Sequence, residues 1–254
     1  MGCALRVKAR LPGEREPKPW DVAAHRFIAE HPDLAEAIAK ADAASESIGV
    51  SAHDYVTLYR AIHKLQARTV LECGTGKTTY ALAAAMKALG GALRLVSMDD
   101  DEGWHQHAKR RFPFGEFPFV ELHYSPKAVW GISLIQGTVY SDVPAAPYDF
   151  VFVDGPSAHI GLQPCPNMDF VRLVSESDRP IPAIVDLRKL TVMAYAILFP
   201  GKVHFTESRI AVVDPVSRAD LGIPGKREFP NKTRLLETFP RLVDVYPDDP
   251  VDLL

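Results

Sequence analysis

Residues 68–79 read Arg-Thr-Val-Leu-Glu-Cys-Gly-Thr-Gly-Lys-Thr-Thr, and this stretch decides the fold class. A short apolar run ends at the acid Glu72. Gly74 and Gly76 follow, and Tyr80–Leu89 is typical of a helix. A strand, a tight glycine turn and a helix in this order form a cradle for a small molecule, because glycine lets the backbone approach a ligand closely. The helix N-terminus then offers free N–H groups and positive potential to an anionic group.

Four interpretations of this turn compete. The Gly-Lys-Thr at 76–78 resembles the end of a P-loop, but that motif needs a glycine where Leu71 stands. A dinucleotide fingerprint needs glycine or alanine where Thr79 stands, and the charge of Glu72 would repel a pyrophosphate. S-adenosylmethionine (SAM) fits better, since its sulfonium and α-amino groups are positive and its carboxylate can meet the helix N-terminus or Lys77. The fourth interpretation is an ordinary turn that binds no ligand.

Acids at later strand ends favour the SAM interpretation. Leu93–Met98 is apolar and precedes Asp99, which follows Gly74 at about the distance expected of a ribose-binding acid. A carboxylate in this place can accept hydrogen bonds from both ribose hydroxyls. Phe150–Val153 is wholly apolar, which indicates a buried strand, and Asp154 follows it. Both acids therefore stand where open α/β sheets bind their ligands, outside the carboxyl ends of the strands.

With these segments the chain resembles the class I SAM-dependent methyltransferases, and among them the small-molecule O-methyltransferase-like branch. The resemblance covers residues 55–213 and rests on five segments in order, Val70–Thr79, Val96–Trp104, His123–Pro126, Phe150–Pro156 and Ile184–Arg188. It implies a Rossmann-like three-layer α/β sandwich. Its sheet would have seven mostly parallel strands in the order 3-2-1-4-5-7-6, with strand 7 antiparallel.

The resemblance also implies a set of site residues. Those expected to hold the cofactor are Glu72, Gly74, Thr75, Gly76, Lys77, Thr78, Asp99, Asp100, Trp104, Ser125 and Asp154. Candidates for a catalytic base or an orienting group are Asp154, His159 and Asp186. Catechol-type O-methyltransferases bind Mg²⁺ through an acid in the place of Asp154 and an acidic pair after strand 5. Leu187 replaces the second member of that pair, so we expect no metal.

SAM carries an activated methyl group on sulfur, so the protein would only have to align the reactants and exclude water. The expected function is transfer of this methyl to an oxygen or nitrogen of a small-molecule acceptor by in-line displacement. Two alternatives stay open, a SAM- or nucleoside-binding module without catalysis and an NAD-dependent oxidoreductase on a similar sheet. The sequence does not identify the acceptor.

Composition excludes several other classes. The 254 residues are 47% apolar and 24% charged, which is typical of a globular protein. A net charge of −3 without a basic block argues against a nucleic-acid partner. No apolar stretch reaches the length of a membrane span, no signal-peptide core follows Met1, and the three cysteines form no disulfide or metal pattern. We therefore expect no membrane partner and a cytoplasmic location, and we leave open a homodimer.

Four parts are expected along the chain. Residues 1–19 are basic and proline-bearing and predict a flexible arm, 20–66 a helical extension or cap, 67–214 the SAM-binding core, and 215–254 a proline-rich extension. Helices are predicted at Val22–Ala29, Leu34–Ala44, Ser51–Leu65, Met168–Glu176, Leu190–Leu198 and Thr233–Thr238. Further strands are predicted at Phe119–Tyr124, Ile181–Val185, Lys202–Phe205 and Arg209–Val213. Asp21 and Ser51 are predicted N-caps.

Overall fold

The computed structural model of the protein describes residues 18–44, 50–186, 188–222, 245–246 and 249–254. The main sheet contains β1 (Thr69–Cys73), β2 (Arg94–Asp99), β3 (Val120–Tyr124), β6 (Phe150–Val153), β9 (Ile181–Asp186), β10 (Val203–Thr206), β11 (Ile210–Val216) and β12 (Val245–Tyr246). Two hairpins add β4 (Lys127–Ile132) with β5 (Ile135–Tyr140), and β7 (His159–Ile160) with β8 (Gln163–Pro164). The α-helices are α1 (Pro19–Glu30), α2 (Pro32–Ala44), α3 (Ala52–Leu65), α4 (Lys77–Leu89), α5 (Glu102–Arg111), α6 (Asp169–Ser175) and α7 (Lys189–Leu198), and the 3-10 helices are η1 (Arg218–Asp220) and η2 (Pro250–Leu253).

The strand order is β12-β10-β11-β9-β6-β1-β2-β3. Strand β11 runs antiparallel to both of its neighbours, and the other pairs are parallel. The first seven strands of this sheet in chain order are β1, β2, β3, β6, β9, β10 and β11. Numbered 1 to 7 in that order, they lie side by side as 3-2-1-4-5-7-6, which confirms the expected topology and the Rossmann-like α/β class. The expectation of seven strands was wrong by one, because the short β12 extends the sheet beside β10.

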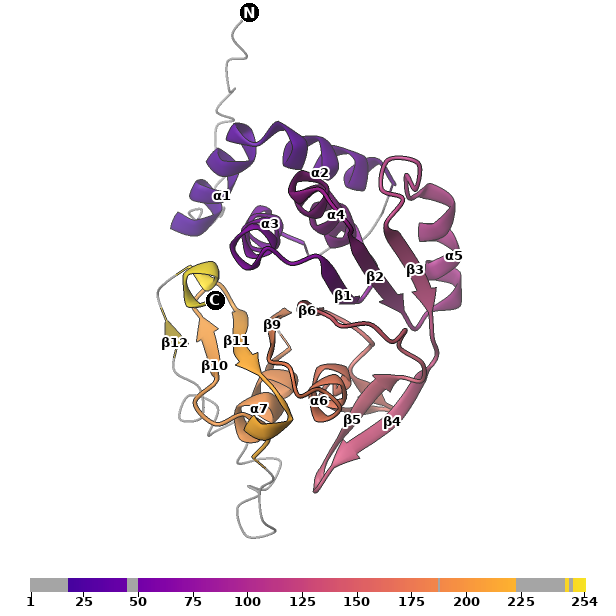
Figure 1. Ribbon diagram of the computed structural model, residues 1–254, viewed down its shortest axis with the longest axis vertical. Coiled ribbons are helices and arrows are strands. Elements are labelled where there is room, and N and C mark those ends of the chain that lie inside the picture. Colours follow the sequence, from indigo (N-terminus) through magenta and orange to yellow (C-terminus); the bar gives the residue numbers. More distant parts are fainter. Residues whose placement is uncertain (1–17, 45–49, 187, 223–244, 247–248) are drawn as a thin grey trace, which may run out of the picture.

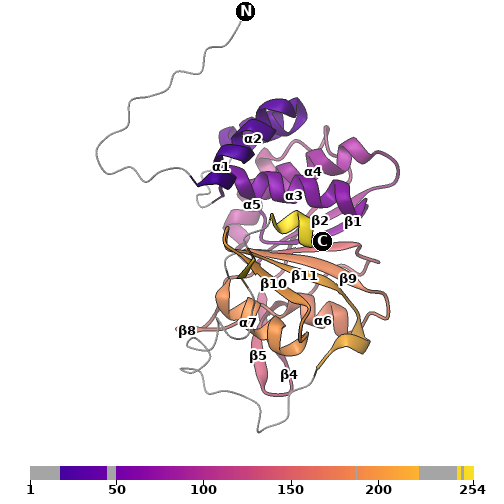
Figure 2. The ribbon, with the colours of Figure 1, turned by 90° about the vertical axis from the view of Figure 1, so that its left-hand side faces the viewer.

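Alternation along the strands divides the core into two layers. Val70 and Phe152 belong to the layer under α1–α4, whereas Leu71 and Val153 belong to the layer under α6, α7 and β5. Because successive side chains of a strand point to opposite faces, helices cover both sides of the sheet and make the three-layer sandwich (Figures 1 and 2).

Helices α2 and α3 stack on α4 on one side of the sheet, and α1 packs on α3 and α2 (Figure 1). A capping box at Ser51 and Asp54 starts α3, as predicted. The predicted N-cap at Asp21 was wrong, since Lys18 is the N-cap residue of α1. Pro19 stands at the first helical position, where its fixed φ suits a helix and its missing N–H costs nothing. The helix therefore begins within the expected flexible arm, whose other residues, 1–17, lie outside the described ranges.

The last residues of the chain pack against α3. Arg60 forms ion pairs with Asp249 and Asp252, and the ammonium of Lys64 donates to the carbonyl of Val251 at 2.7 Å. Figure 2 shows η2 beside α3. The predicted helix at 233–238 lies outside the described residues. Within those ranges no helix combines the length and the apolar character needed to cross a bilayer.

Candidate functional site

The turn between β1 and α4 lies at the carboxyl edge of the sheet, between the ends of β2 and β6 (Figure 1). The amides of Gly74 and Thr75 donate to the carbonyl of Met98 at 3.0 and 2.9 Å. Gly74 has a φ of +109°, and a Cβ placed on it would stand 3.0 Å from the carbonyl carbon of Asp154. Position 74 therefore requires glycine for its backbone conformation and for the approach of the turn after β6.

The second glycine of the turn, Gly76, is the N-cap residue of α4 and borders open space. Its φ is −168°, which any residue adopts, and an added Cβ would meet no atom of the described residues within 4 Å. The N–H groups of Lys77 and Thr78 in the first helical turn have no acceptor within the helix. The start of α4 thus offers both room and hydrogen-bond donors to an anionic group.

Glu72 lies beneath this turn. Its side chain is fully buried between the sheet and α4, and its oxygens accept hydrogen bonds from the hydroxyls of Thr78, Thr79 and Ser97, each at 2.6 Å. Burial raises the pKa of Glu72 to about 7, although the three hydroxyl groups oppose the shift. This geometry does not fit the expected direct contact between Glu72 and the cofactor. The carboxyl group instead fixes the hydroxyls at the start of α4.

Lys77 is also directed away from the turn. Its ammonium forms an ion pair with Asp42 of α2 at 2.7 Å. The hydroxyl of Thr78 is already bonded to Glu72. At these two positions the structure leaves the backbone N–H groups, not the side chains, for a ligand.

The end of β2 brings Asp99 and Trp104 to the turn. Asp99 is 8% exposed, and its Oδ1 accepts the N–H of Asp101 at 2.8 Å. Burial raises the pKa of Asp99 to about 7, and the carboxylates of Asp100 and Asp101 add to the shift. The indole N–H of Trp104 donates to the carbonyl of Thr75 at 2.7 Å, so the ring packs against the turn.

Asp100 and Ser125 hold neighbouring loops together. The carboxylate of Asp100 accepts the N–H and the hydroxyl of Ser157, both at 3.2 Å, and lies 3.6 Å from the ammonium of Lys127. Ser125 is buried, and its Oγ accepts the N–H of Asp142 at 2.9 Å. Their expected contacts with the cofactor stay predictions.

Arg188 was missed as a site residue by sequence reasoning. Its Nη2 and Nε donate to Oδ1 of Asp154 at 3.0 and 3.3 Å, and its Nη1 donates to the carbonyl of Pro156 at 3.1 Å. Burial raises the pKa of Asp154, and the guanidinium opposes that shift. In the sequence, the acid nearest to Arg188 is Asp186, two residues away. The side chain of Arg188 reaches across to the end of β6 instead. The signal in the sequence that could have identified Arg188 as a site residue is that it is the cation nearest to a strand-end acid.

Asp186 ends β9, next to β6 in the sheet. Burial raises its pKa to about 7, and the charges of Asp154 and of Asp54 in α3 add to the shift. Among the described residues, no donor forms a hydrogen bond with this carboxyl group. Asp186 therefore combines a pKa near neutrality with free oxygens, which are the properties of a general base.

His159 is not brought to this cluster by any contact between described residues. It is exposed on β7, in the hairpin that follows β6. Leu187, which matters for a metal site, lies outside the described residues. Within the described ranges, no three His, Cys, Asp or Glu side chains form a group that could hold a metal ion.

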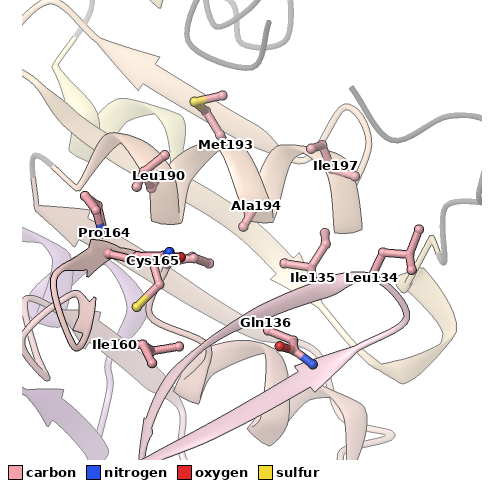
Figure 3. Close-up of a pocket in the computed structure, with 12 residues that line it drawn as sticks. Leu134, Ile135, Gln136, Ile160, Pro164, Cys165, Leu190, Met193, Ala194 and Ile197 are labelled. Atoms are coloured by element: carbon pink, nitrogen blue, oxygen red, sulfur yellow. The ribbon is translucent and has the colours of Figure 1, made fainter. Parts of the chain in front are cut away.

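A groove of about 340 Å³ lies along α7, facing β5 and the β7–β8 hairpin (Figure 3). Its walls include Ile135, Cys165, Leu190 and Met193, and none of its lining residues is charged. A sulfonium or carboxylate placed there would lose hydration without gaining a charged partner. The groove is therefore distinct from the expected SAM site, and residues 160 and 163–166 of the loop after β6 contribute to it.

Comparisons with known proteins found only distant likenesses. No family model matches the chain, and no curated protein does. Cofactor-bound Rv0187 from MTB is 20% identical, with a TM-score of 0.49 over 80% of this chain and 100% of that one. The O-methyltransferase TomG from Streptomyces achromogenes, in complex with SAM, is 23% identical, with a TM-score of 0.44 over 74% and 80%. An O-methyltransferase from Bacillus cereus in complex with SAH is 17% identical, with a TM-score of 0.46 over 76% and 97%.

Likenesses of this size carry no argument about ligand or reaction. The strand order does support a conclusion about the architecture. An antiparallel seventh strand between strands 5 and 6 is what the resemblance in the sequence implied. The fold is a Rossmann-like three-layer α/β sandwich with the strand order that this resemblance implied. In this fold the turn after β1 and the acids after β2, β6 and β9 share one edge of the sheet, which makes that edge the candidate active site.

Proposed function

We propose that the protein is a SAM-dependent methyltransferase, which moves the methyl group of SAM to an oxygen or nitrogen of a small-molecule acceptor by in-line displacement. One observation carries the proposal. The open space at Gly76 lies at the start of α4, and the backbone of the adjoining Thr75 hydrogen-bonds to the buried carboxyl of Asp99. An α-amino acid carboxylate suits the first site and ribose hydroxyls suit the second.

The charges of this edge support SAM over a dinucleotide. Asp99, Asp154 and Asp186 all end strands here, and Arg188 is already paired with one of them. A pyrophosphate would meet these carboxylates with little compensation, whereas the sulfonium of SAM is attracted by them. The same excess of acids favours a neutral or cationic acceptor over an anionic one.

We assign the proton transfer to Asp186. A carboxylate whose conjugate acid has a pKa of about 7 and which accepts no hydrogen bond can take the proton of an acceptor hydroxyl as the methyl leaves the sulfur. For a nitrogen acceptor it can take the proton of the ammonium before transfer, which frees the lone pair that attacks the methyl. Asp154 is held by Arg188 and suits an orienting role. His159 is exposed, so it suits neither role in the described arrangement.

The helices within residues 20–66 are proposed to cap the acceptor side. The start of α3 places Asp54 close enough to raise the pKa of both Asp154 and Asp186. An acceptor that reaches Asp186 would therefore also be exposed to the charge of Asp54. The absence of a metal requirement, a cytoplasmic location and a homodimer stay predictions.

Calorimetry with SAM, S-adenosylhomocysteine (SAH) and NAD tests the cofactor. We expect SAM and SAH to bind and NAD not to bind, and binding of NAD alone would overturn the proposal in favour of an oxidoreductase. Incubation of methyl-labelled SAM with a metabolite mixture then tests catalysis. Label should appear in a small molecule with the wild type, whereas Asp186→Asn should bind SAH equally well and transfer little. Binding without transfer in both proteins would favour a non-catalytic module.

A further inference from the structure

The turns after β1 and β6 touch each other backbone to backbone. A Cβ added to Gly155 would stand 2.7 Å from the amide nitrogen of Gly74 and 2.5 Å from the phenolic oxygen of Tyr140. A Cβ on Gly74 would in turn meet the carbonyl of Asp154. Since neither turn has room to yield, a shift in the loop after β6 must move the turn that we assign to the cofactor.

Asn167 fixes the loop after β6 by a hydrogen bond to its backbone. This residue is fully buried just before α6, and its side-chain amide donates to the carbonyl of Gly155 and, at 3.1 Å, to Oδ2 of Asp169. Its side-chain oxygen accepts the N–H of Asp169 at 3.0 Å, and its own N–H donates to the hydroxyl of Thr191 at 3.0 Å. Every polar group of the side chain therefore has a partner, as burial requires.

Asp169 and Tyr140 complete the connection. The carboxylate of Asp169 accepts the N–H of Tyr140 at 3.0 and 3.2 Å. The phenol of Tyr140 donates to the carbonyl of Met98 at 3.2 Å, the same oxygen that accepts the amides of Gly74 and Thr75. These contacts form a closed ring through the ends of β1, β2, β5 and β6, and its buried side chains are those of Asn167, Asp169 and Tyr140.

We propose that Asn167 is a positioning residue for methyl transfer, which acts through Gly155 and, with Tyr140, sets the cofactor turn at 74–76 against the catalytic loop at 154–156. This inference rests on the proposed function. A hydrocarbon side chain at 167 would pack the core without the cost of burying an amide, so packing alone does not account for an asparagine. The amide supplies a directed bond to one carbonyl, and that bond fixes the distance between the two turns.

Amide hydrogen exchange and SAH calorimetry on the full chain test the proposal. Asn167→Ala should speed exchange at Gly74 and Thr75 about tenfold and weaken SAH binding about tenfold. Val174→Ala is the matched control, because Val174 is fully buried in the same helix layer but lies outside the ring. It should lower the melting temperature similarly while leaving both readouts unchanged. Equal effects of the two variants on exchange would overturn the proposal.

A milder pair of variants covers the case in which Asn167→Ala does not fold. Tyr140→Phe removes only the hydroxyl that donates to Met98. Tyr148→Phe removes the hydroxyl of another buried tyrosine, which donates to Pro144 before the other end of β6. Exchange at Gly74 should quicken in the first variant alone. Identical exchange in both would also overturn the proposal. If wild-type protein binds no SAH, the proposed function fails, while the exchange comparison still decides the role of Asn167.

Discussion

The guanidinium of Arg188 lies 3.0 Å from Oδ1 of Asp154 and so ties the residue before α7 to the loop after β6. The pair lies at the edge of the sheet where β1, β6 and β9 end side by side. The neighbouring carboxyl of Asp186 forms no ion pair among the described residues, and the same guanidinium only partly opposes the rise in its pKa. Asp154 and Asp186 are therefore chemically different, although both stand at the carboxyl end of a strand.

Replacement of Arg188 should change the pKa of Asp154 more than it changes the free energy of unfolding. In Arg188→Gln the pKa of Asp154 should rise further, because the group that opposes the effect of burial is gone. The side chain of Asp154 is 37% exposed, so the free energy of unfolding should fall by less than about 1 kcal/mol. NMR titration of the carboxyl carbon and thermal unfolding measure the two effects. Arg218→Gln breaks the exposed pair with Asp178 and should change neither.

The carboxyl of Asp99 should contribute to cofactor affinity. Asp99→Asn keeps an acceptor for the N–H of Asp101 but removes the charge. We expect SAH binding to weaken by about 1.5–3 kcal/mol, the range for loss of a charged hydrogen-bond partner. Calorimetry measures it, with the exposed Glu102→Gln as the control for a nearby charge. Unchanged affinity in Asp99→Asn would argue against contact with the ribose.

The buried Glu72 should make stability depend on pH. Its folded pKa of about 7 lies above the ordinary value of 4.5, so between these values the folded state holds more protons than the unfolded state. Its contribution therefore weakens the fold as pH rises from about 4.5 to 7. Glu72→Gln resembles the protonated acid, so it should match the wild type near pH 5 and gain about 2–3 kcal/mol relative to it by pH 8.

Urea unfolding at several pH values measures this difference. Glu121→Gln removes an exposed acid that pairs with Arg94 and should leave the pH profile of the wild type unchanged. A constant offset between Glu72→Gln and the wild type at every pH would show that Glu72 has the same pKa in the folded and unfolded states, so that burial does not raise it.

The two glycines of the turn should respond differently to alanine. Gly74→Ala forces a Cβ against Asp154 at a positive φ and should destabilise the fold by about 1–3 kcal/mol. Gly76→Ala should leave the melting temperature nearly unchanged, because the added Cβ meets open space. It should nevertheless weaken SAH binding, since that space is assigned to the cofactor. Full SAH affinity in a stable Gly76→Ala protein would place the cofactor elsewhere.

The order and type of the core elements could be predicted from the sequence. Strand β6 matches its predicted range, and β1, β2, β9 and α7 differ from theirs by one or two residues at their ends. Buried parallel strands are continuous apolar runs and helices carry a periodic apolar face, so both signals are local. The hairpin of β4 and β5 was missed. Its residues Lys127–Ile132 alternate between exposed and half-buried, a weak signal without a buried run.

The direction of each site side chain was decided by the tertiary structure. Glu72 follows Val70 at a spacing of two and so faces α4, and burial there brought the hydroxyls of Thr78, Thr79 and Ser97 to it. The sequence placed acids at strand ends, which is a property of the chain alone. The partners of these side chains are groups far apart in the chain. They decide which acid pairs with a cation, which acid has no partner, and which amide supports the loop. Only the packing of the layers sets the positions that these hydrogen bonds and ion pairs require.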